Sequence, residues 1–355
     1  MVPKTTILAS DPIPGTQHRH PTRLESTAMA ATKINFGFVF FILLLLFGNS
    51  ALAEIKKIYV SNEKSSTLTV LDGQSYKVLK TIKTCKRPRG VHFNKDKTKF
   101  FVGCADDNVI AIYETASGKR VGRLRNIAEP ETFDLTPDGK VLIVSNEEDS
   151  TASFVDIASG KIIGDVETGE EPEGVQVTKD GSTVYVASEA ANLVHVIDVK
   201  SMKVTADILV GTRPRRFALT PDESELWVSA ELAGLVDIID TKTHKVISDI
   251  SFLPTGFRRN EVTPVDLLMT RDGNTAFVAL GRANHVAVVD VVNRKVKNYL
   301  LVGKRPWGLA LSSDEKKLFV ANGLSDDISV IDVTKNKVIR SIPVGQVPYG
   351  ILIVE

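Results

Sequence analysis

Residues 303–332, GKRPWGLALSSDEKKLFVANGLSDDISVID, decide the fold because their signals recur along the whole chain at one spacing. Three landmarks repeat: a proline anchor, an acidic residue in a turn, and an acidic residue that closes an Ile/Val pair. Each series advances in steps of 42 residues with one step of 50. Their agreement, including on where eight extra residues lie, predicts seven tandem units of about 42 residues. The anchors are Pro88, Pro130, Pro172, Pro214, Pro264, Pro306 and Pro348; the turn residues are Asp96, Asp138, Asp180, Asp222, Asp272 and Asp314; the closing residues are Asp72, Glu114, Asp156, Asp198, Asp240, Asp290 and Asp332.

Within one unit, apolar residues alternate with polar ones or form short runs between turn residues, which is typical of β-strands. In the unit of Pro306 this pattern predicts strands over residues 307–311, 317–321, 328–333 and 338–344. Polar hairpin connections, Ser-Asp-Glu-Lys and Thr-Lys-Asn-Lys, join the first pair and the last pair. Each unit is therefore predicted to be a four-stranded antiparallel meander.

The inner strands of such a sheet are apolar on both faces, so the sheet must pack against copies of itself. Seven sheets around an axis form a β-propeller, which also leaves few exposed strand edges. The repeats begin with strands two to four (residues 58–61, 68–71 and 78–82) and end with a lone strand one (residues 349–354). We therefore expect an all-β, seven-bladed β-propeller, closed by the C-terminal strand one pairing with the N-terminal strands two to four. The alternative, an open row of sheets, would leave apolar end faces uncapped.

The first 53 residues are expected to lie outside the propeller, which then spans residues 54–355. Residues 29–53 combine Lys33, an apolar run over residues 36–47 and Ala-Leu-Ala before Glu54, the pattern of a signal peptide cleaved after Ala53. The alternative, a membrane anchor, would need roughly 20 apolar residues. Residues 1–28 lack periodicity and are interpreted as an over-called N-terminal extension. We expect a periplasmic protein with no membrane span after cleavage.

The composition argues against two classes of protein. With 43% hydrophobic and 25% charged residues, the chain is globular rather than disordered. Its formal net charge is +1 and it has no basic run with interleaved aromatic residues, so nucleic-acid binding is not expected.

Motifs in the repeats resemble a known family. The second strands carry Tyr-Val-Ser-Asn (residues 59–62), Ile-Val-Ser-Asn (143–146), Tyr-Val-Ala-Ser (185–188), Trp-Val-Ser-Ala (227–230) and Phe-Val-Ala-Asn (319–322). With the Pro-x-Gly anchors and the Val-Ile-Asp closures, residues 57–355 resemble the YVTN family of seven-bladed β-propellers. Within that family, the signal peptide, the 42-residue spacing and the single enlarged unit resemble the PQQ-dependent catabolism-associated β-propeller proteins.

That resemblance implies a periplasmic protein encoded alongside quinoprotein alcohol-oxidising systems and an ABC transporter, with no settled catalytic activity. Our leading hypothesis is a non-enzymatic protein that supports PQQ- and quinoprotein-dependent alcohol oxidation by binding a ligand or a partner protein at the channel mouth. The partner would be a quinoprotein dehydrogenase, a cytochrome or a transporter component. Members of the family also include surface-layer proteins and relatives that bind haem d-type cofactors, so the fold alone does not fix the function.

The residues beside the anchors are expected to form a ring, because strand one is innermost in a blade and its proline lies at one mouth of the channel. The candidate ligand-binding residues are Arg87, Arg89, Arg213, Arg215, Arg216, Arg305, Trp307 and Tyr349, and the acidic rim comprises Glu129, Glu131, Glu171 and Glu173. The ends of second strands add Glu147, Glu148, Glu189 and Glu231 at the same mouth. The connection that holds the insertion, residues 252–261, is expected to hang over this mouth so that Phe257, Arg258 and Arg259 cover a ligand.

Two interpretations of this ring stay open. The charges can solvate the rim and pair with each other, each exposed pair contributing about 0 to 1 kcal/mol. Alternatively, the arginines together with Trp307 and Tyr349 can clamp a planar anion by bidentate contacts and stacking. Pyrroloquinoline quinone (PQQ), a flat tricarboxylate, fits that chemistry and is the candidate cofactor. A protein partner on this charge-divided face is equally compatible.

No catalytic or metal-binding residue is assigned. The chain has no Cys-x-x-Cys-His, Gly-x-Ser-x-Gly, His-Glu-x-x-His or glycine-rich phosphate loop. One alternative is a channel-based oxidoreductase or lactone hydrolase, in which Glu131 and Glu173 would need burial to split their pKa values, whereas a channel mouth is expected to be wet. The other is a haem d-type tetrapyrrole carrier with His92, the one histidine expected on an inner strand, as axial ligand.

The propeller region contains two cysteines, Cys85 before the first strand of a unit and Cys104 at the end of its second strand. Both positions lie at the same end of adjacent strands, and export would allow a disulfide to persist. We therefore expect a structural disulfide between them.

Overall fold

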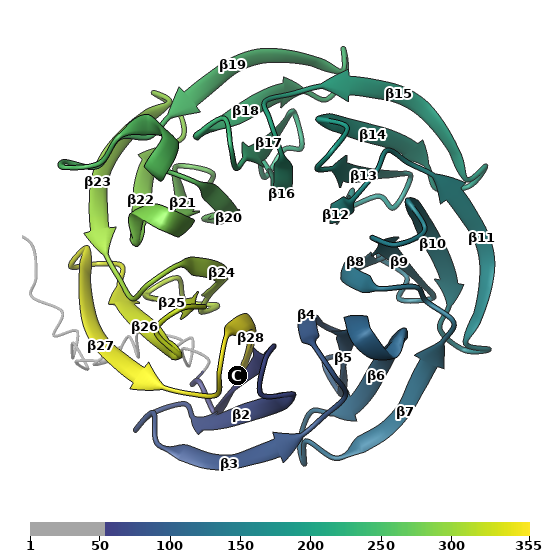
Figure 1. The fold of residues 1–355 in the computed structure, drawn as a ribbon, viewed down its shortest axis with the longest axis horizontal. Helices are drawn as coiled ribbons and strands as arrows, with labels where there is room; N and C mark the ends of the chain where they lie inside the picture. Colours follow the sequence, from purple (N-terminus) through teal and green to yellow (C-terminus); the bar gives the residue numbers. More distant parts are fainter. Residues whose placement is uncertain (1–53) are drawn as a thin grey trace, which may run out of the picture. The chain divides into compact units, whose positions relative to one another are not determined.

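The computed structural model describes residues 54–355, which form seven four-stranded antiparallel sheets around a central axis (Figure 1). The predicted fold is confirmed, including the number of blades and the number of strands in each. The predicted signal peptide, residues 29–53, and the preceding extension, residues 1–28, lie outside the described residues. Within the described chain, no helix has the length and hydropathy needed to cross a bilayer.

Each blade runs from an inner strand at the channel to an outer strand at the rim. Blade 1 comprises β4 (Pro88–Phe93), β5 (Lys99–Cys104), β6 (Val109–Glu114) and β7 (Arg120–Arg125); blade 2 comprises β8 (Pro130–Leu135), β9 (Val141–Asn146), β10 (Thr151–Asp156) and β11 (Lys161–Glu167). Blade 3 comprises β12 (Pro172–Val177), β13 (Thr183–Ser188), β14 (Leu193–Asp198) and β15 (Lys203–Leu209); blade 4 comprises β16 (Pro214–Leu219), β17 (Glu225–Ala230), β18 (Leu235–Asp240) and β19 (Lys245–Ser251). Blade 5 comprises β20 (Pro264–Met269), β21 (Thr275–Leu280), β22 (His285–Asp290) and β23 (Lys295–Leu301); blade 6 comprises β24 (Pro306–Leu311), β25 (Lys317–Asn322), β26 (Asp327–Asp332) and β27 (Lys337–Pro343). Blade 7 comprises β28 (Pro348–Val354), β1 (Lys57–Asn62), β2 (Thr67–Asp72) and β3 (Val78–Lys83), and three short 3-10 helices, η1 (Ala105–Asp107), η2 (Arg259–Glu261) and η3 (Gly281–Ala283), lie in connections.

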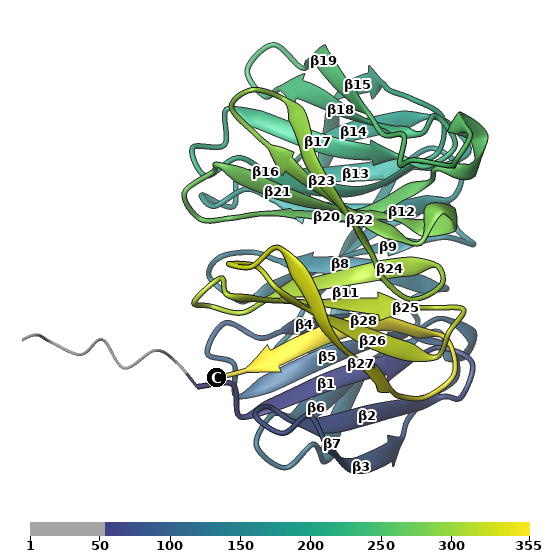
Figure 2. The ribbon, with the colours of Figure 1, turned by 90° about the vertical axis from the view of Figure 1, so that its left-hand side faces the viewer.

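Blade 7 closes the ring. Its inner strand β28 comes from the C-terminus and pairs antiparallel with β1, in a register that places Lys57 opposite Val354 and Tyr59 opposite Leu352. The backbone N–H of Lys56 also donates to the carbonyl oxygen of Val354 (2.7 Å). Figure 2 shows the yellow β28 beside the purple β1. The two ends of the propeller are thus joined by a sheet rather than by a covalent link.

The hydrophobic core is divided into seven clusters, one between each pair of neighbouring blades. The third residue of every second strand is large and fills one of these gaps. Trp227, the largest of them, is fully buried between blades 4 and 5. A lone sheet would expose this residue to water, so the apolar area is buried only when blades pack against each other. The seven residues are Tyr59, Phe101, Ile143, Tyr185, Trp227, Phe277 and Phe319.

The Pro-x-Gly anchors allow the inner strands of neighbouring blades to approach each other closely. A Cβ added to Gly308 would overlap the carbonyl oxygen of Tyr349 in the next blade. The serines of the second strands bond to carbonyls at the same position, as in the hydrogen bond from Ser145 Oγ to the carbonyl oxygen of Glu173 (2.7 Å). These two motifs therefore hold adjacent blades together at the axis, and they place the residue after each proline at the channel.

Candidate functional site

The side chains that follow the anchor prolines meet at one end of the channel, which we call the proline-side mouth. The strands that carry them, β4, β8, β12, β16, β20, β24 and β28, surround the axis (Figure 1). These side chains form a charged half, from blades 1 to 4, and an apolar and aromatic half, from blades 5 to 7. In chain order they are Arg89, Glu131, Glu173, Arg215, Val265, Trp307 and Tyr349.

The charged half is a continuous chain of ion pairs. Arg89 Nη1 lies 2.5 Å from Glu131 Oε2, and its Nη2 lies 3.9 Å from Glu173 Oε2. On the other side, Arg215 Nη2 lies 3.4 Å from Glu173 Oε1, and Arg215 also pairs with Glu189 at the end of β13. Each arginine therefore bridges carboxylates from different strands, and Arg89 reaches two blades further round the ring.

The residues before the prolines add further pairs at the same mouth. Arg213 Nε lies 3.2 Å from Glu231 Oε2, while Arg305 Nη2 lies 3.1 Å from Glu231 Oε1. Arg87 pairs with Glu129. Glu231 also lies 3.5 Å from Arg215 Nη1, so it is shared among three arginines from two blades. Ion pairs therefore hold the sequence-predicted rim residues together.

The charged half of the mouth is buried rather than wet, contrary to the expectation from the sequence. The exposed fraction is 0% for Glu131, 3% for Glu173 and 8% for both Arg89 and Arg215. The strand pattern could not reveal this, because the cover comes from side chains of distant blades, Tyr349 above all. The small energies of exposed ion pairs do not apply here; removing one partner of a buried pair typically costs about 3 to 5 kcal/mol.

Tyr349 crosses the mouth from the apolar half. Its hydroxyl donates to Glu173 Oε1 (2.8 Å) and accepts from Arg89 Nη2 (3.2 Å) and from Arg216 Nη2. The guanidinium carbon of Arg89 lies 4.6 Å from the centroid of the tyrosine ring, and Trp307 packs against that ring edge-on, with centroids 5.6 Å apart. One side chain of the C-terminal strand therefore links blade 7 to blades 1, 3 and 4 across the axis.

The pKa values of the carboxyl groups in the ring are shifted in opposite directions. Desolvation and the nearby charge of Glu173 raise the pKa of Glu131 well above its usual value and raise the pKa of Glu189 to about 8. Glu173 is also desolvated, but the guanidiniums of three arginines, Arg215 first, outweigh this and hold its pKa below the usual range. Burial therefore raises the pKa of Glu131 and Glu189 against the opposing charge of the arginines that pair with them, whereas the arginines prevail at Glu173.

Next to Tyr349 the channel holds a cavity of about 210 Å³, lined by residues of all seven inner strands. Arg216 and Asp266 provide its charged groups, and Trp307 and Tyr349 provide its aromatic surface. Arg216 Nη2 lies 2.8 Å from Glu173 Oε1, whereas its Nη1 has no hydrogen-bond partner among the described residues. The cavity therefore combines one incompletely bonded guanidinium with two aromatic side chains.

Asp266 is a cavity residue that the repeat pattern did not mark as functional. It stands where other anchors have glycine, as does Arg216, and this departure from the motif is the signal that could have found it. Its Oδ2 accepts the N–H of Leu309 (2.7 Å) and its Oδ1 accepts the N–H of Leu267 (2.9 Å). Burial raises the pKa of Asp266, and the charge of Arg216 opposes that shift.

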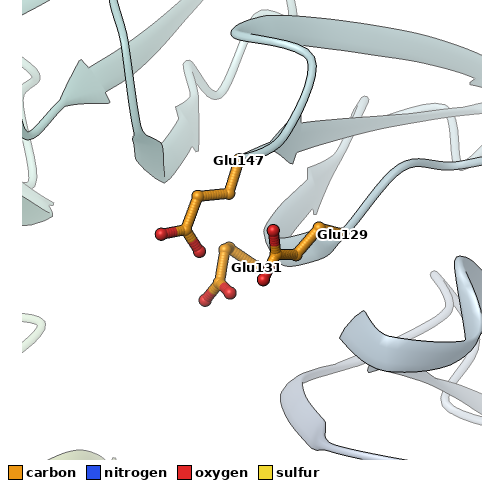
Figure 3. A group of neighbouring side chains, drawn as sticks. All are labelled: Glu129, Glu131 and Glu147. Atoms are coloured by element: carbon orange, nitrogen blue, oxygen red, sulfur yellow. The ribbon is translucent and has the colours of Figure 1, made fainter.

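Glu129, Glu131 and Glu147 form an acidic cluster on blade 2, with one carboxylate oxygen from each within 4.8 Å of the others (Figure 3). Three carboxylates could ligate a hard cation. However, Arg87 already pairs with Glu129, and its Nη2 lies 3.3 Å from Glu131 Oε1 and 3.9 Å from Glu147 Oε2. A guanidinium therefore neutralises this cluster, and we assign no metal to it.

The insertion packs over blade 5 instead of covering the mouth, contrary to the expectation from the sequence. Phe252 is buried in the cluster between blades 4 and 5, and Phe257 packs edge-on against His285 of β22, with centroids 5.6 Å apart. Arg258 and Arg259 are exposed. The phenylalanines direct this connection onto the middle of the blade because they gain more by burial there than above a charged mouth.

His92 lies on the inner strand β4, as expected, at the end of the channel away from the prolines. Its Nδ1 is 2.7 Å from the carbonyl oxygen of Phe93, and its Nε2 is 3.4 Å from Asp134 Oδ1. Its side chain is 45% exposed. The imidazole is accessible, but both ring nitrogens already face protein groups.

Ser188, His195 and Asp207 show triad-like distances that sequence reasoning missed. Ser188 Oγ is 2.9 Å from His195 Nε2, and His195 Nδ1 is 2.6 Å from Asp207 Oδ1. The arrangement is structural, because Ser188 is fully buried and the same Nε2 accepts the N–H of Gly169 (2.8 Å). The matching positions of blade 2 form a similar polar chain through Asn146, Ser153 and Asp165.

Cys85 and Cys104 are joined in a disulfide within blade 1, with their Cα atoms 5.7 Å apart. This separation is within the usual range for the bond. The link ties the connection before β4 to the end of β5 and so braces the backbone next to Arg87.

Comparisons with known proteins agree with the fold. A family model described as YNCE-like beta-propeller matches residues 51–312. No curated protein sequence matches the chain.

Solved structures resemble the chain at low sequence identity. The Pseudomonas aeruginosa periplasmic gluconolactonase PpgL is 18% identical, with a TM-score of 0.71 over 84% of this chain and 99% of that one. Kuenenia stuttgartiensis hydrazine synthase is 20% identical, with a TM-score of 0.66 over 74% of this chain and 88% of that one. The dihydro-heme d1 dehydrogenase NirN in complex with DHE is 13% identical, with a TM-score of 0.64 over 84% of this chain and 75% of that one. At these identities the likeness shows the fold alone.

Proposed function

The chain belongs to the YNCE-like β-propeller family, and from this premise we propose that it is an exported, non-enzymatic binding protein that supports quinoprotein-dependent alcohol oxidation. It takes a small, planar, anionic molecule at the proline-side mouth. The observation that carries the proposal is the cavity next to Tyr349, which is lined in part by Arg216, a guanidinium whose buried Nη1 has no hydrogen-bond partner among the described residues. PQQ is the ligand to test first, because the repeat motifs resemble those of PQQ-associated propellers.

The cavity lining suits such a ligand. A carboxylate would accept a charge-assisted hydrogen bond from the Arg216 guanidinium, while the flat ring of the ligand would stack against Trp307 or Tyr349. Burial raises the pKa of Asp266, and both of its carboxyl oxygens already accept backbone N–H groups. Recognition therefore combines one ionic contact with stacking.

The structure also limits the proposal. Arg89 and Arg215 are bound to buried glutamates, so they hold the mouth in shape rather than offering free donors. Ligand pockets typically measure about 300 to 1,000 Å³, and this cavity of about 210 Å³ is smaller. A tricyclic ligand therefore enters only if Tyr349 swings away from Glu173.

The alternative functions gain less support from this geometry. Glu131 and Glu173 have the divided pKa values that acid/base chemistry needs, yet neither lines the cavity, so a substrate has no space beside them. His92, the ligand expected in a tetrapyrrole carrier, lies at the opposite end of the channel with its ring nitrogens facing Phe93 and Asp134.

Tryptophan fluorescence offers a direct test with PQQ as the probe. Of the two tryptophans, Trp307 lines the cavity and Trp227 is buried between blades, so quenching reports on the mouth. We expect saturable quenching. Loss of the contact in Arg216→Ala should weaken binding by at least about tenfold, since a hydrogen bond to a charged group contributes about 1.5 to 3 kcal/mol.

The control is Arg258→Ala, which removes an exposed arginine away from the cavity and should leave the affinity unchanged. Arg213→Ala combined with Arg305→Ala removes mouth charge from two residues that do not themselves line the cavity, although Arg305 lies over the Trp307 ring, and should weaken binding by a smaller factor. Quenching that never saturates, or equal affinity in a folded Arg216→Ala protein, would overturn the proposal.

We also expect the propeller to bind a partner protein at the mouth, which would be a quinoprotein dehydrogenase, a cytochrome or a transporter component. Immobilised propeller incubated with periplasmic extract should enrich a protein with haem or quinone absorbance in the visible range. If the immobilised Arg213→Ala/Arg305→Ala variant retains the same proteins from the extract, the partner does not bind at the mouth.

A further inference from the structure

The connections at the proline-side end of the blades form one face around the mouth. In six of the seven blades the loop after strand two is hydrogen-bonded to the carbonyl oxygen of the residue before the anchor, as in the bond from the N–H of Glu189 to Glu171 (2.9 Å). The same bond joins Glu231 to Arg213 (2.8 Å). In blade 5 the N–H of Arg282 donates to Thr263 Oγ1 instead (2.8 Å). Charges in these two kinds of loop are therefore presented on a common surface.

One side of this face carries only acidic exposed charges. They lie in the connections of blade 2 and between blades 2 and 3, and we call them the acidic arc. Their side chains make no ion pair with the described residues, in contrast to the glutamates of the mouth. The acidic arc comprises Glu148, Asp149, Glu167, Glu170 and Glu171.

A basic arc lies across the ring from it. It spans the connection between blades 4 and 5, the loop of η3 in blade 5 and the connection between blades 5 and 6, so that blade 2 and blade 5 stand on different sides of the channel (Figure 1). One exposed carboxylate, Glu261, falls in this stretch, and it accepts the backbone N–H of Arg258 (2.8 Å). The basic arc comprises Arg258, Arg259, Arg282 and Lys304.

Exposed leucines occupy the sector between the two arcs. Leu209 ends the outer strand of blade 3, Leu253 follows the outer strand of blade 4, and Leu232 lies in the loop after β17. Their exposed fractions are 72%, 51% and 51% respectively. Exposed apolar side chains on the same end of adjacent blades form a surface that a partner can cover.

Around this face the surface changes from acidic through apolar to basic. When a second copy is turned over by 180°, its basic sector faces the acidic sector of the first copy, and its acidic sector faces the basic one. A two-fold axis lying in the face between blades 3 and 4 sets blade 2 of one copy over blade 5 of the other. It also sets Leu209 over Leu253 of the second copy. Each acidic arc then meets the basic arc of the other copy, so this contact occurs twice, as an isologous interface requires. The formal net charge of +1 produces no strong repulsion between copies.

We propose that two copies of this chain associate face to face through the acidic arc, the leucines and the basic arc. The chemistry that selects a second copy is charge complementarity in two places with an apolar contact between them. Because the arcs are exposed, the association is sensitive to salt and weakens when the Debye length falls from about 14 Å near 0.05 M to a few ångströms near 1 M.

Charge reversal with mixing tests this proposal on the full propeller. Sedimentation at low salt should give a dimer for the unmodified protein and monomers for two variants that reverse every charge of one arc: Glu148→Lys/Asp149→Lys/Glu167→Lys/Glu170→Lys/Glu171→Lys and Arg258→Glu/Arg259→Glu/Arg282→Glu/Lys304→Glu. One variant then presents only basic arcs and the other only acidic arcs. An equimolar mixture of the two should therefore regain the dimer, which misfolding or a general loss of solubility would not produce.

Lys200→Glu/Lys242→Glu provides the matched control, because both lysines are exposed in strand-three to strand-four turns at the opposite end of the blades. That protein should remain dimeric. Leu209→Asp should dissociate the dimer without altering either arc. The proposal is overturned by a monomeric unmodified protein at about 100 μM, by dimeric charge-reversal variants, or by a mixture that stays monomeric. Each monomeric variant keeps every cavity residue, so ligand titration stays independent of this result.

Discussion

Single side chains decide what the channel can bind. The blades have the same backbone fold, and they differ in the side chains that strand one presents to the axis. Position-matched residues there are arginine, glutamate, valine, tryptophan or tyrosine. At a surface these charges would contribute little. Here Tyr349 and the pairs around Glu173 and Glu231 exclude water from them, so each substitution affects several blades at once.

The pH dependence of stability should reveal the buried carboxyl groups. The folded pKa of Glu189 is about 8, above its ordinary value of 4.5, so the native state binds more protons than the unfolded chain between these two pH values. The raised pKa of Glu131 acts in the same direction. The melting temperature should therefore fall as pH rises through this window. Glu173, whose pKa is lowered, acts only at more acidic pH.

Calorimetry between about pH 4.5 and 8 can measure how the melting temperature changes with pH. Glu189→Gln, which cannot ionise, should flatten this dependence, while Glu148→Gln, at an exposed position on the same face, should not. A melting temperature that rises with pH in the unmodified protein would contradict the assignment.

The hydroxyl of Tyr349 should contribute measurably to stability. Tyr349→Phe removes its hydrogen bond to ionised Glu173 and those from Arg89 and Arg216, so we expect a loss of about 2 kcal/mol in the free energy of unfolding. Tyr59→Phe is the control, since that hydroxyl bonds only to the carbonyl oxygen of Thr115 (2.8 Å) and its loss should cost about 1 kcal/mol. Urea unfolding compares the two; equal losses would show that the charged partners add nothing.

At the scale of the strand, the Pro-x-Gly anchor is a packing device. The missing Cβ of Gly308 leaves room for the carbonyl oxygen of Tyr349, and Gly90, Gly174 and Gly350 leave room for the matching carbonyl in the blade that follows each. Blades 2, 4 and 5 carry Thr132, Arg216 and Asp266 instead. The glycines therefore allow close approach of the next strand, whereas at the other three positions a side chain stands beside the channel.

Gly308→Ala should loosen the contact between β24 and β28. The new Cβ would overlap backbone that cannot rotate away, so we expect a loss of about 1 to 3 kcal/mol. Gly122→Ala in β7 is the matched change, because its Cβ would meet only the side chain of Ile112, at an ordinary 3.5 Å. Equal unfolding midpoints for the two variants would contradict this account of the motif.

The whole molecule depends on closure of the ring, because the seven core clusters lie between blades rather than within them. Two of these clusters require β28, which contributes Ile351 to one and Leu352 to the other. Closure also brings Tyr349 to the mouth. Stability and the candidate site therefore share one strand.

Deleting residues 348–355 should open the ring. Blade 7 would lose its inner strand, and blades 6 and 1 would lose the surface against which they pack, so cooperative unfolding and Trp307 quenching should both disappear. A synthetic peptide of residues 346–355 added to the truncated protein should restore part of both signals. A truncated protein with an unchanged unfolding midpoint would show that the ring does not need this strand.

The sequence by itself determined the fold and which residues surround the proline-side mouth. Spacing fixed seven units, strand periodicity fixed four strands in each, and the split of one unit between the two ends predicted how β28 closes blade 7. These features are local or periodic, so they can be read without coordinates.

Only the tertiary structure decided the state of the site. The exposure of Glu131, the reach of Tyr349 across the axis, the position of Phe257 on blade 5 and the role of Asp266 in the cavity depend on side chains from different blades. Periodicity says which residues share a ring, but it does not say which partner neutralises each charge or covers it from water. That depends on long-range packing, which the closed ring alone provides.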